Sequence, residues 1–248
     1  MLDFLLSYFG LAILCFLLAL CVLVYIHEKV DDGRRVELGS DESGADIARR
    51  ILKDNGVHDV LVLEEEGLLC DHYNPFLRCL TLSPDVYTGR HASAAAIAAH
   101  EAGHALQHAQ GSISLWLRSL LAYPAHVGTG ISEQIVILGF AMAGFQVAVH
   151  GTIAYWVVFS GSMLFLSCFM CSLLLLINEF DASARAKVQL ARLNIAQSEK
   201  QQRAVRSVLR AAALTYVASA VLSGIQVLYW VVRALSADES ESRPPSQD

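Results

Sequence analysis

Five consecutive residues of this chain have the types and spacing of a metal-dependent hydrolytic site. They read His100-Glu101-Ala102-Gly103-His104, which is an H-E-x-x-H pattern. On a helix, side chains four positions apart lie on one face, so the two imidazoles can bind one Zn²⁺. Glu101 follows the first imidazole and can reach a water on the metal without becoming a ligand. The pattern predicts His100 and His104 as zinc ligands and Glu101 as the general base.

A third ligand is expected, because a catalytic zinc usually has three protein ligands and one open position. Glu179 is the best candidate in the sequence. It directly follows a long apolar segment, at the same side of the predicted membrane as the two histidines. Asp181 is a weaker candidate because it points about 200° around a helix from Glu179.

Two further residues could act on the substrate. His72 and Tyr73 lie between two predicted strands and could donate hydrogen bonds to the oxyanion that forms during hydrolysis. Polar residues in such a loop also commonly stabilise the turn itself, so both interpretations stay open.

The composition indicates a membrane protein. Of the 248 residues, 54% are hydrophobic and 17% are charged, and the formal net charge is −6. About 20 apolar residues cross a hydrocarbon core of ~30 Å. Four apolar windows without Asp, Glu, Lys or Arg predict four transmembrane helices, at residues 4–26, 135–149, 153–177 and 211–232. The lipid bilayer is therefore an expected partner, and the acidic balance suggests no nucleic acid partner.

The basic residues indicate an orientation. Four crossings place both termini on one face and residues 27–134 and 178–210 on the other. That other face carries 16 of the 18 Lys and Arg residues, and the loop 178–210 has seven of them against three acidic residues. Short loops rich in Lys and Arg stay in the cytoplasm, so we expect the site region to be cytoplasmic.

The sequence predicts four regions. Residues 1–26 form an N-terminal anchor, 27–134 the region with the metal site, 135–235 three transmembrane helices with a loop helix at 178–210, and 236–248 a disordered tail. Within 27–134, the apolar pattern predicts helices at 43–55 and 91–109. Short β-type runs at 60–63 and 77–82 predict a hairpin, and the second run could pair with an extended peptide substrate.

Four segments carry a family resemblance: SGADIARRILKDNGVHDV, DHYNP, AAHEAGHALQHA and NEFDASARA. With the N-terminal anchor, they resemble the bacterial YugP-type neutral zinc metallopeptidases over roughly residues 1–235. The chain is more distantly similar to gluzincin membrane proteases of the CAAX-prenyl-protease and HtpX type, whose third ligand begins a helical E-x-x-x-D motif. In that comparison the Glu corresponds to Glu179, and Ser183 holds the Asp position. Ser183 could hydrogen-bond a ligating histidine without a carboxylate's charge.

The resemblance implies a mainly α membrane protein. It would have four transmembrane helices and a small α+β zincin-like domain, which carries a short β-hairpin and the HExxH helix. The implied function is a zinc-dependent metalloendopeptidase in the plasma (inner) membrane of a bacterium, hydrolysing protein or peptide substrates by zinc-activated water. A non-catalytic metal-binding scaffold would have no need of Glu101. A transporter would usually carry ionisable residues inside its spans, and the four windows contain none.

Overall fold

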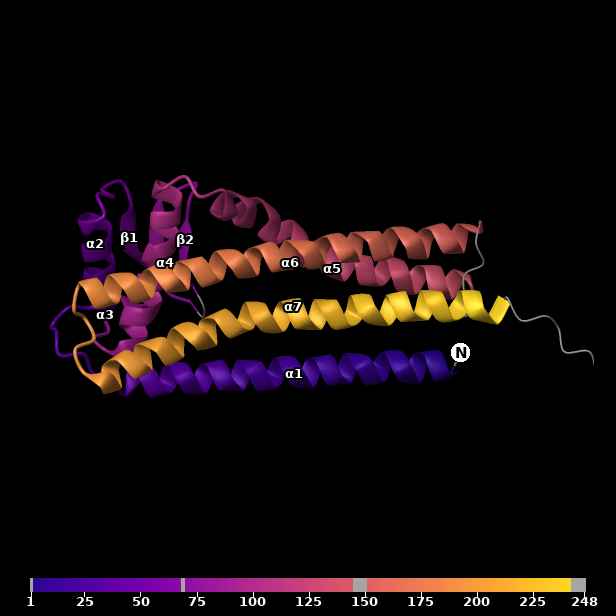
Figure 1. Cartoon of the computed structure of the whole chain (residues 1–248), viewed down its shortest axis with the longest axis horizontal. Coiled ribbons are helices and arrows are strands. Elements are labelled where there is room, and N and C mark those ends of the chain that lie inside the picture. The colour runs from indigo at the N-terminus through magenta and orange to yellow at the C-terminus, as the bar shows by residue number, and fades with distance from the viewer. Residues whose placement is uncertain (1, 68–69, 145–150, 242–248) are drawn as a thin grey trace, which may run out of the picture. The chain divides into compact units, whose positions relative to one another are not determined.

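The computed structural model describes residues 2–67, 70–144 and 151–241, and the chain divides into two compact units. The first unit comprises the described residues of Met1–Ala19, Leu120–Leu173 and Ala218–Asp248. The second comprises those of Leu20–Ser119 and Leu174–Val217. Figure 1 shows the elements, which are α1 (Leu2–Arg34), α2 (Gly44–Asp54), β1 (Leu61–Glu64), β2 (His72–Asn74), β3 (Cys79–Leu82), α3 (Pro84–Thr88), α4 (Ala92–Ala109), α5 (Ile113–Met142), α6 (Ile153–Arg192) and α7 (Glu199–Glu241).

The second unit contains a small three-stranded sheet with the strand order β1-β3-β2. β3 pairs in parallel with β1 and antiparallel with β2. The predicted hairpin between residues 60–63 and 77–82 is therefore wrong, because these two runs are parallel neighbours and the antiparallel partner of β3 is β2. β3 also lies in the centre of the sheet. Its backbone is paired on both sides and offers no free edge to a peptide.

The two helices predicted in this region are confirmed. Ser43 caps α2 in a capping box, in which the Ser43 hydroxyl accepts from the Asp46 N–H while the Asp46 carboxylate accepts from the Ser43 N–H. His91 caps α4 by accepting a hydrogen bond from the Ala94 N–H, 3.1 Å away. After α4 the chain turns at Gly111, whose φ of +67° suits a residue without a Cβ.

The core of the second unit joins elements that are distant in the sequence. It contains Ile47 and Ile51 of α2, Leu80 and Leu82 of β3, and Leu209 of α7, each at most 1% exposed. Alanines of α4 fill the space between these larger side chains, and small side chains allow neighbouring backbones to come close. The HEAGH helix is thus the central helix of this unit.

Among the described residues, three helices are long and apolar enough to cross a membrane: Tyr8–Arg34, Ile153–Arg192 and Glu199–Trp230. The corresponding elements α1, α6 and α7 contain three of the four predicted windows. The window 135–149 begins in α5, where the described apolar stretch is Gly130–Met142, and ends outside the described residues. A fourth crossing, and hence a common face for both termini, stays a prediction.

The first unit is held together by close helix contacts. An added Cβ at Gly139 of α5 would lie 2.9 Å from the backbone N of Val158 in α6. Phe140 of α5 stacks on Trp230 of α7 with ring centroids 5.4 Å apart. Small residues that let backbones approach are typical of helix packing in membranes.

The end of α7 differs from the prediction. The helix continues to Glu241, so residues 236–241 are helical where a disordered tail was expected, and residues 242–248 lie outside the described part. Nothing between Trp230 and Glu241 is a Gly or Pro, so the local sequence contains no strong helix breaker.

Candidate metal centre

The three predicted ligands come from two helices of the second unit. His100 and His104 lie one turn apart on α4, and Glu179 lies on α6, which continues without a break from its apolar segment to Arg192. Gly103 allows the two helices to meet here. A Cβ at this position would lie 2.7 Å from the carbonyl oxygen of Ala182 in α6. The Gly in HEAGH therefore allows the close approach that brings the carboxylate to the imidazoles.

The ligand atoms have the spacing of a metal site. One atom from each of His100, His104 and Glu179 lies within 4.8 Å of the others, and all three residues are buried. Glu179 Oε2 is 3.1 Å from His100 Nε2 and 3.5 Å from His104 Nε2. Tetrahedral ligands at ~2.0–2.2 Å from zinc lie roughly 3.3–3.6 Å apart, so the separation at His104 falls within this range and that at His100 is slightly shorter.

Two buried polar atoms at this place lack hydrogen bonds. His104 Nε2 and Glu101 Oε2 have no hydrogen-bond partner among the described residues. An unsatisfied buried polar group costs about 1–3 kcal/mol, so such atoms need an explanation. A cation bound by His104 Nε2 and a water beside Glu101 Oε2 would supply one. The donor set of two imidazoles and one carboxylate also matches the ligands that zinc prefers.

Each imidazole is oriented through its second nitrogen. His100 Nδ1 lies 3.2 Å from the Ser183 hydroxyl, the contact that the E-x-x-x-D comparison suggested. His104 Nδ1 lies 2.9 Å from Oε1 of Gln107. When each Nε2 faces a metal, Nδ1 carries the proton and donates to these oxygens. Both histidines thus have their ring orientation and tautomer set by a polar neighbour.

Gln107 is a member of the candidate site that the sequence did not predict. Its side chain is fully buried, and its amide nitrogen donates to the Asn178 carbonyl at 3.0 Å and to Asp181 Oδ2 at 2.7 Å. It therefore connects His104 to α6. A signal was present in the sequence, because position 107 is three residues after His104 and shares its helix face.

Asp181 takes part in this support and does not lie among the candidate ligands. Its carboxylate also accepts a hydrogen bond from Arg185 Nε at 2.7 Å. The Arg185 guanidinium in turn donates to Gln110 Oε1 at 2.6 Å. A chain of hydrogen bonds thus runs from His104 to the surface of the unit.

His72 and Tyr73 lie in strand β2 and do not belong to the group formed by His100, His104 and Glu179. The Tyr73 hydroxyl donates to His108 Nδ1 at 2.7 Å, and both line a separate cavity with Arg78. Burial raises the pKa of Tyr73 to about 12 and lowers the pKa of His108. The lowered pKa favours the neutral imidazole, whose Nδ1 can accept the hydrogen bond from the phenol hydroxyl. An oxyanion role for either residue stays a prediction.

Comparison with known proteins shows the family of this chain. The chain belongs to the family described as "Putative neutral zinc metallopeptidase", whose sequence model matches residues 8–235. Over 198 residues it is 37% identical to "Putative membrane protease YugP" of Bacillus subtilis (strain 168), an alignment that covers 80% of this chain and 83% of that protein. No solved structure matches the chain significantly. The family resemblance predicted from the HEAGH and EFDAS segments is confirmed.

Proposed function

We propose that this protein is a membrane-embedded zinc-dependent metalloendopeptidase, with His100, His104 and Glu179 as zinc ligands and Glu101 as general base. The observation that carries the proposal is the convergence of three buried ligand atoms within 4.8 Å beside an unpartnered carboxylate oxygen. Buried polar atoms normally have hydrogen-bond partners, so the lack of one at His104 Nε2 and Glu101 Oε2 favours a bound ion and water over a purely structural polar cluster. The family membership supports the same class of chemistry.

The residues have distinct roles in hydrolysis. Zinc, when bound, would lower the pKa of a water and polarise the carbonyl of the peptide bond. Glu101 Oε2 accepts the proton of the attacking water and passes it to the leaving amine nitrogen. Ser183 and Gln107 hold the two imidazoles in place through Nδ1, so that each Nε2 keeps its direction.

The membrane orientation is part of the proposal. The apolar helices α1, α6 and α7 would anchor the protein in the bacterial plasma membrane, and the basic segment after Glu179 would keep the second unit in the cytoplasm. A fusion of alkaline phosphatase to the C-terminus should be active outside, and a fusion of green fluorescent protein there should be dark. A fluorescent fusion together with an inactive phosphatase fusion would place the C-terminus in the cytoplasm. In that case either the orientation is the reverse of the proposed one or the chain lacks the fourth crossing.

Metal analysis beside proteolysis tests the catalytic assignment. We expect full-length protein in detergent to contain one zinc ion per chain and to cleave casein. Glu101→Gln should keep its zinc and lose roughly 10²–10⁴-fold in kcat, the usual contribution of a general base. Glu179→Ala should lose zinc and activity together.

The matched control is Glu199→Gln, because Glu199 is exposed in the first turn of α7 and pairs with Arg203. It should resemble the wild type in both measurements. Casein cleavage by Glu101→Gln at the wild-type rate would refute its role as base. Zinc-loaded wild-type protein that cleaves no substrate would favour the metal-binding scaffold.

A further inference from the structure

A cavity of about 260 Å³ lies beside the candidate metal centre and has two chemically different walls. His100, Glu101 and Glu179 form the polar wall, and Asp71 lies at the same cavity. The other wall is mainly aliphatic and comes from α1, α4 and α7, with Thr215 and Tyr216 of α7 as its polar members. Its main residues are Ile26, Val30, Ile97, Val208, Leu209 and Ala212. A peptide bond held at the polar wall would therefore have an apolar surface next to it.

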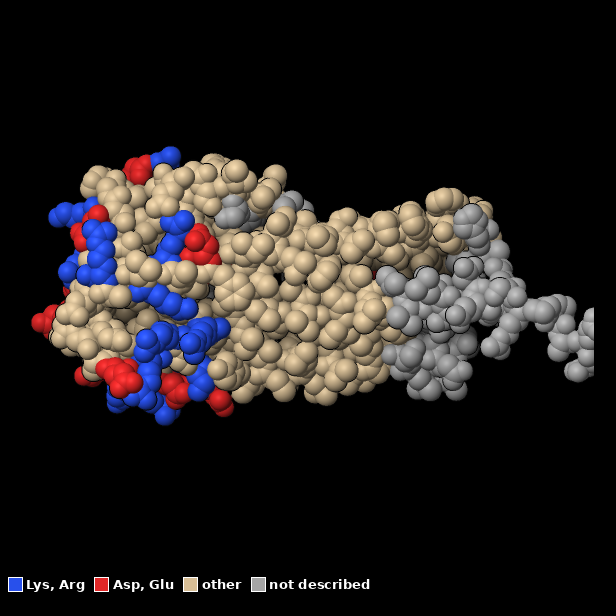
Figure 2. Space-filling model, viewed as in Figure 1, with Lys and Arg blue, Asp and Glu red and all other residues tan. Residues whose placement is uncertain are grey.

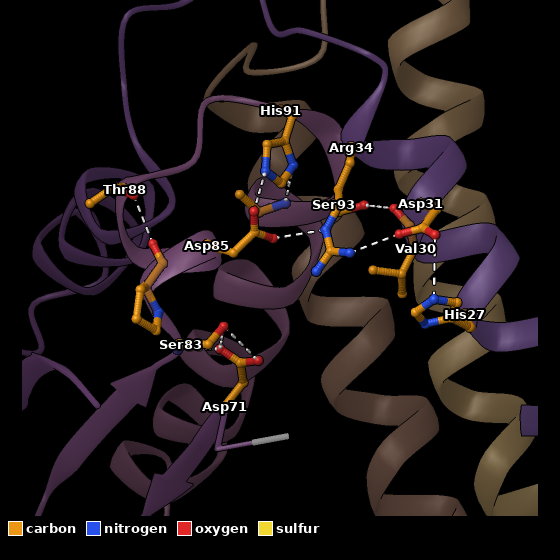
Figure 3. A network of polar contacts seen from close by, with 12 residues as sticks. His27, Val30, Asp31, Arg34, Asp71, Ser83, Asp85, Thr88, His91 and Ser93 are labelled. Atoms are coloured by element: carbon orange, nitrogen blue, oxygen red, sulfur yellow. Dashed lines mark hydrogen bonds and ion pairs between the residues drawn. The ribbon is translucent and has the colours of Figure 1, made fainter. Parts of the chain in front are cut away.

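Hydrogen bonds and close packing fix the α1 part of this wall against α4. The Ser93 hydroxyl at the start of α4 donates to the Val30 carbonyl oxygen at 2.5 Å. A Cβ added to Gly33 would lie 2.4 Å from that hydroxyl. Figure 3 shows the neighbouring Arg34, whose guanidinium joins Asp31 at 2.7 Å and Asp85 at 2.9 Å. The wall is thus formed before any substrate arrives, as is usual for binding sites.

The same cavity lies where three helices change from uncharged to charged sequence. In α1 no Asp, Glu, Lys or Arg occurs from residue 4 to residue 27, and in α6 the first is Glu179 itself. In α7 none occurs between Arg210 and Arg233. In Figure 2 the blue and red side chains gather where Figure 1 labels α2, α3 and α4. Because charged residues avoid the hydrocarbon core, this level of the helices marks the membrane–water boundary.

We propose, on the basis of the proposed function, that this cavity is a specificity subsite for an aliphatic side chain next to the scissile bond. The substrate would be a peptide segment held at the membrane–water boundary. An aliphatic side chain gains free energy by leaving water against this wall, whereas a charged one loses its hydration. An acidic side chain would also be repelled by the carboxylates of Asp71 and Glu101.

The negative charge of Asp71 would by itself favour a basic side chain in the cavity, but the Asp71 carboxylate already has hydrogen-bond partners. Its Oδ1 atom already accepts from the Ser83 N–H at 2.7 Å and from the Ser83 hydroxyl at 3.0 Å. The carboxylate therefore serves the turn between β3 and α3. A preference of the enzyme for Lys or Arg would contradict this interpretation and would assign recognition to Asp71.

Peptides that differ at one residue test the subsite. Full-length protein in lipid nanodiscs would be given quenched fluorescent peptides with Leu, Ala, Lys or Asp on either side of one scissile bond, whose position is checked by mass spectrometry. At one of the two positions, kcat/KM for Leu should exceed that for Ala by at least about 10-fold, as apolar pockets discriminate missing methylenes. If the peptides are cleaved but kcat/KM is equal for Leu and Asp at both positions, the proposed subsite is refuted.

A variant that fills the cavity localises the effect. Ala212→Leu should lower kcat/KM for the Leu peptide by about 10-fold or more and leave the Ala peptide less affected, with unchanged zinc content. Ala191→Leu makes the same change at an exposed position of α6 that does not line this cavity, and should behave as the wild type. If Ala212→Leu does not fold, Val30→Ala enlarges the same wall and should shift the preference from Leu to Phe.

A binding measurement separates this inference from the proposed function. In the Glu101→Gln protein, fluorescence anisotropy of labelled peptides should show a Kd at least about 10-fold lower for the Leu peptide than for the Asp peptide. Apolar-selective binding without any turnover by zinc-loaded wild type would refute the peptidase and leave the cavity's preference standing. Turnover without selective binding would support the peptidase and refute the preference of the cavity for apolar side chains.

Vesicles test the position at the boundary. The Leu peptide would be anchored by an N-terminal palmitoyl chain in phosphatidylcholine–phosphatidylglycerol proteoliposomes, with a spacer of about four or about twenty residues, the longer reaching up to ~70 Å. The peptide with the short spacer should be cleaved several-fold faster than the peptide with the long spacer. Equal rates, or faster cleavage with the long spacer, would place the scissile bond away from the membrane surface.

Discussion

Replacing Gln107 with Met should weaken zinc binding while the three ligands stay intact. Met keeps the length of the side chain but cannot accept the hydrogen bond from His104 Nδ1, which spans 2.9 Å in the structure. It also removes the donor to the Asn178 carbonyl and to Asp181 Oδ2. Because Gln107 is fully buried, water cannot easily replace these contacts.

The size of the effect follows from what is lost. A typical hydrogen bond contributes a net ~0.5–1.5 kcal/mol, and a buried partner left unsatisfied costs about 1–3 kcal/mol. Asp181 keeps its bond from Arg185, so the main loss falls on His104. Removing such a supporting residue usually costs about 10–100-fold in metal affinity, which corresponds to ~1.4–2.7 kcal/mol. We expect a zinc Kd raised within this range.

The assay is competition for zinc between the purified full-length protein and a chelating fluorophore at neutral pH. Gln202→Met provides the matched control, because Gln202 is exposed in α7 and its side-chain amide donates to the Ala196 carbonyl. Gln107→Glu is informative as well. It retains an acceptor for His104 but places a carboxylate oxygen against Asp181, so zinc affinity should also fall. A Kd within twofold of the wild type for Gln107→Met, in a protein of normal thermal stability, would refute the reasoning.

Two further predictions concern the packing and the cap that hold the site. Gly103→Ala should cost about 1–3 kcal/mol of stability and lower the zinc content, because the new Cβ would lie 2.7 Å from the Ala182 carbonyl oxygen. Gly39 has open space around it, so Gly39→Ala is the control and should leave thermal unfolding unchanged. Ser43→Ala should cost ~0.5–2 kcal/mol at neutral pH. The Ser43 hydroxyl also donates to the Asp46 carboxylate and lowers its pKa, so this part of the stabilisation exists above the unfolded pKa of about 3.9 and is lost as pH falls through the lower folded pKa. A difference between wild type and variant that grew in acid would contradict this.

The strand pairing in the sheet shows what the local residue pattern does not predict. The β-type runs around β1 and β3 were recognised, but their pairing was predicted as a hairpin and is parallel. Alternation and turn residues describe a strand and its ends, whereas the neighbour is chosen by the packing of distant segments. The short strand β2, which supplies the antiparallel partner, was assigned to the loop between them.

The sequence by itself determined which residue types the candidate site contains and how they are spaced along each helix. HEAGH on an alanine-rich helix implies two imidazoles on one face because helical periodicity is local, and a charge-free segment followed by Glu179 implies a helix that carries a carboxylate out of the membrane. Tertiary structure alone decided the rest. The contact of Gly103 with Ala182, the hydrogen bonds from Gln107 to Asn178 and Asp181, and the mainly aliphatic wall from α1 and α7 each join residues from separate elements. Such contacts depend on how whole helices pack, which no short window of residues encodes.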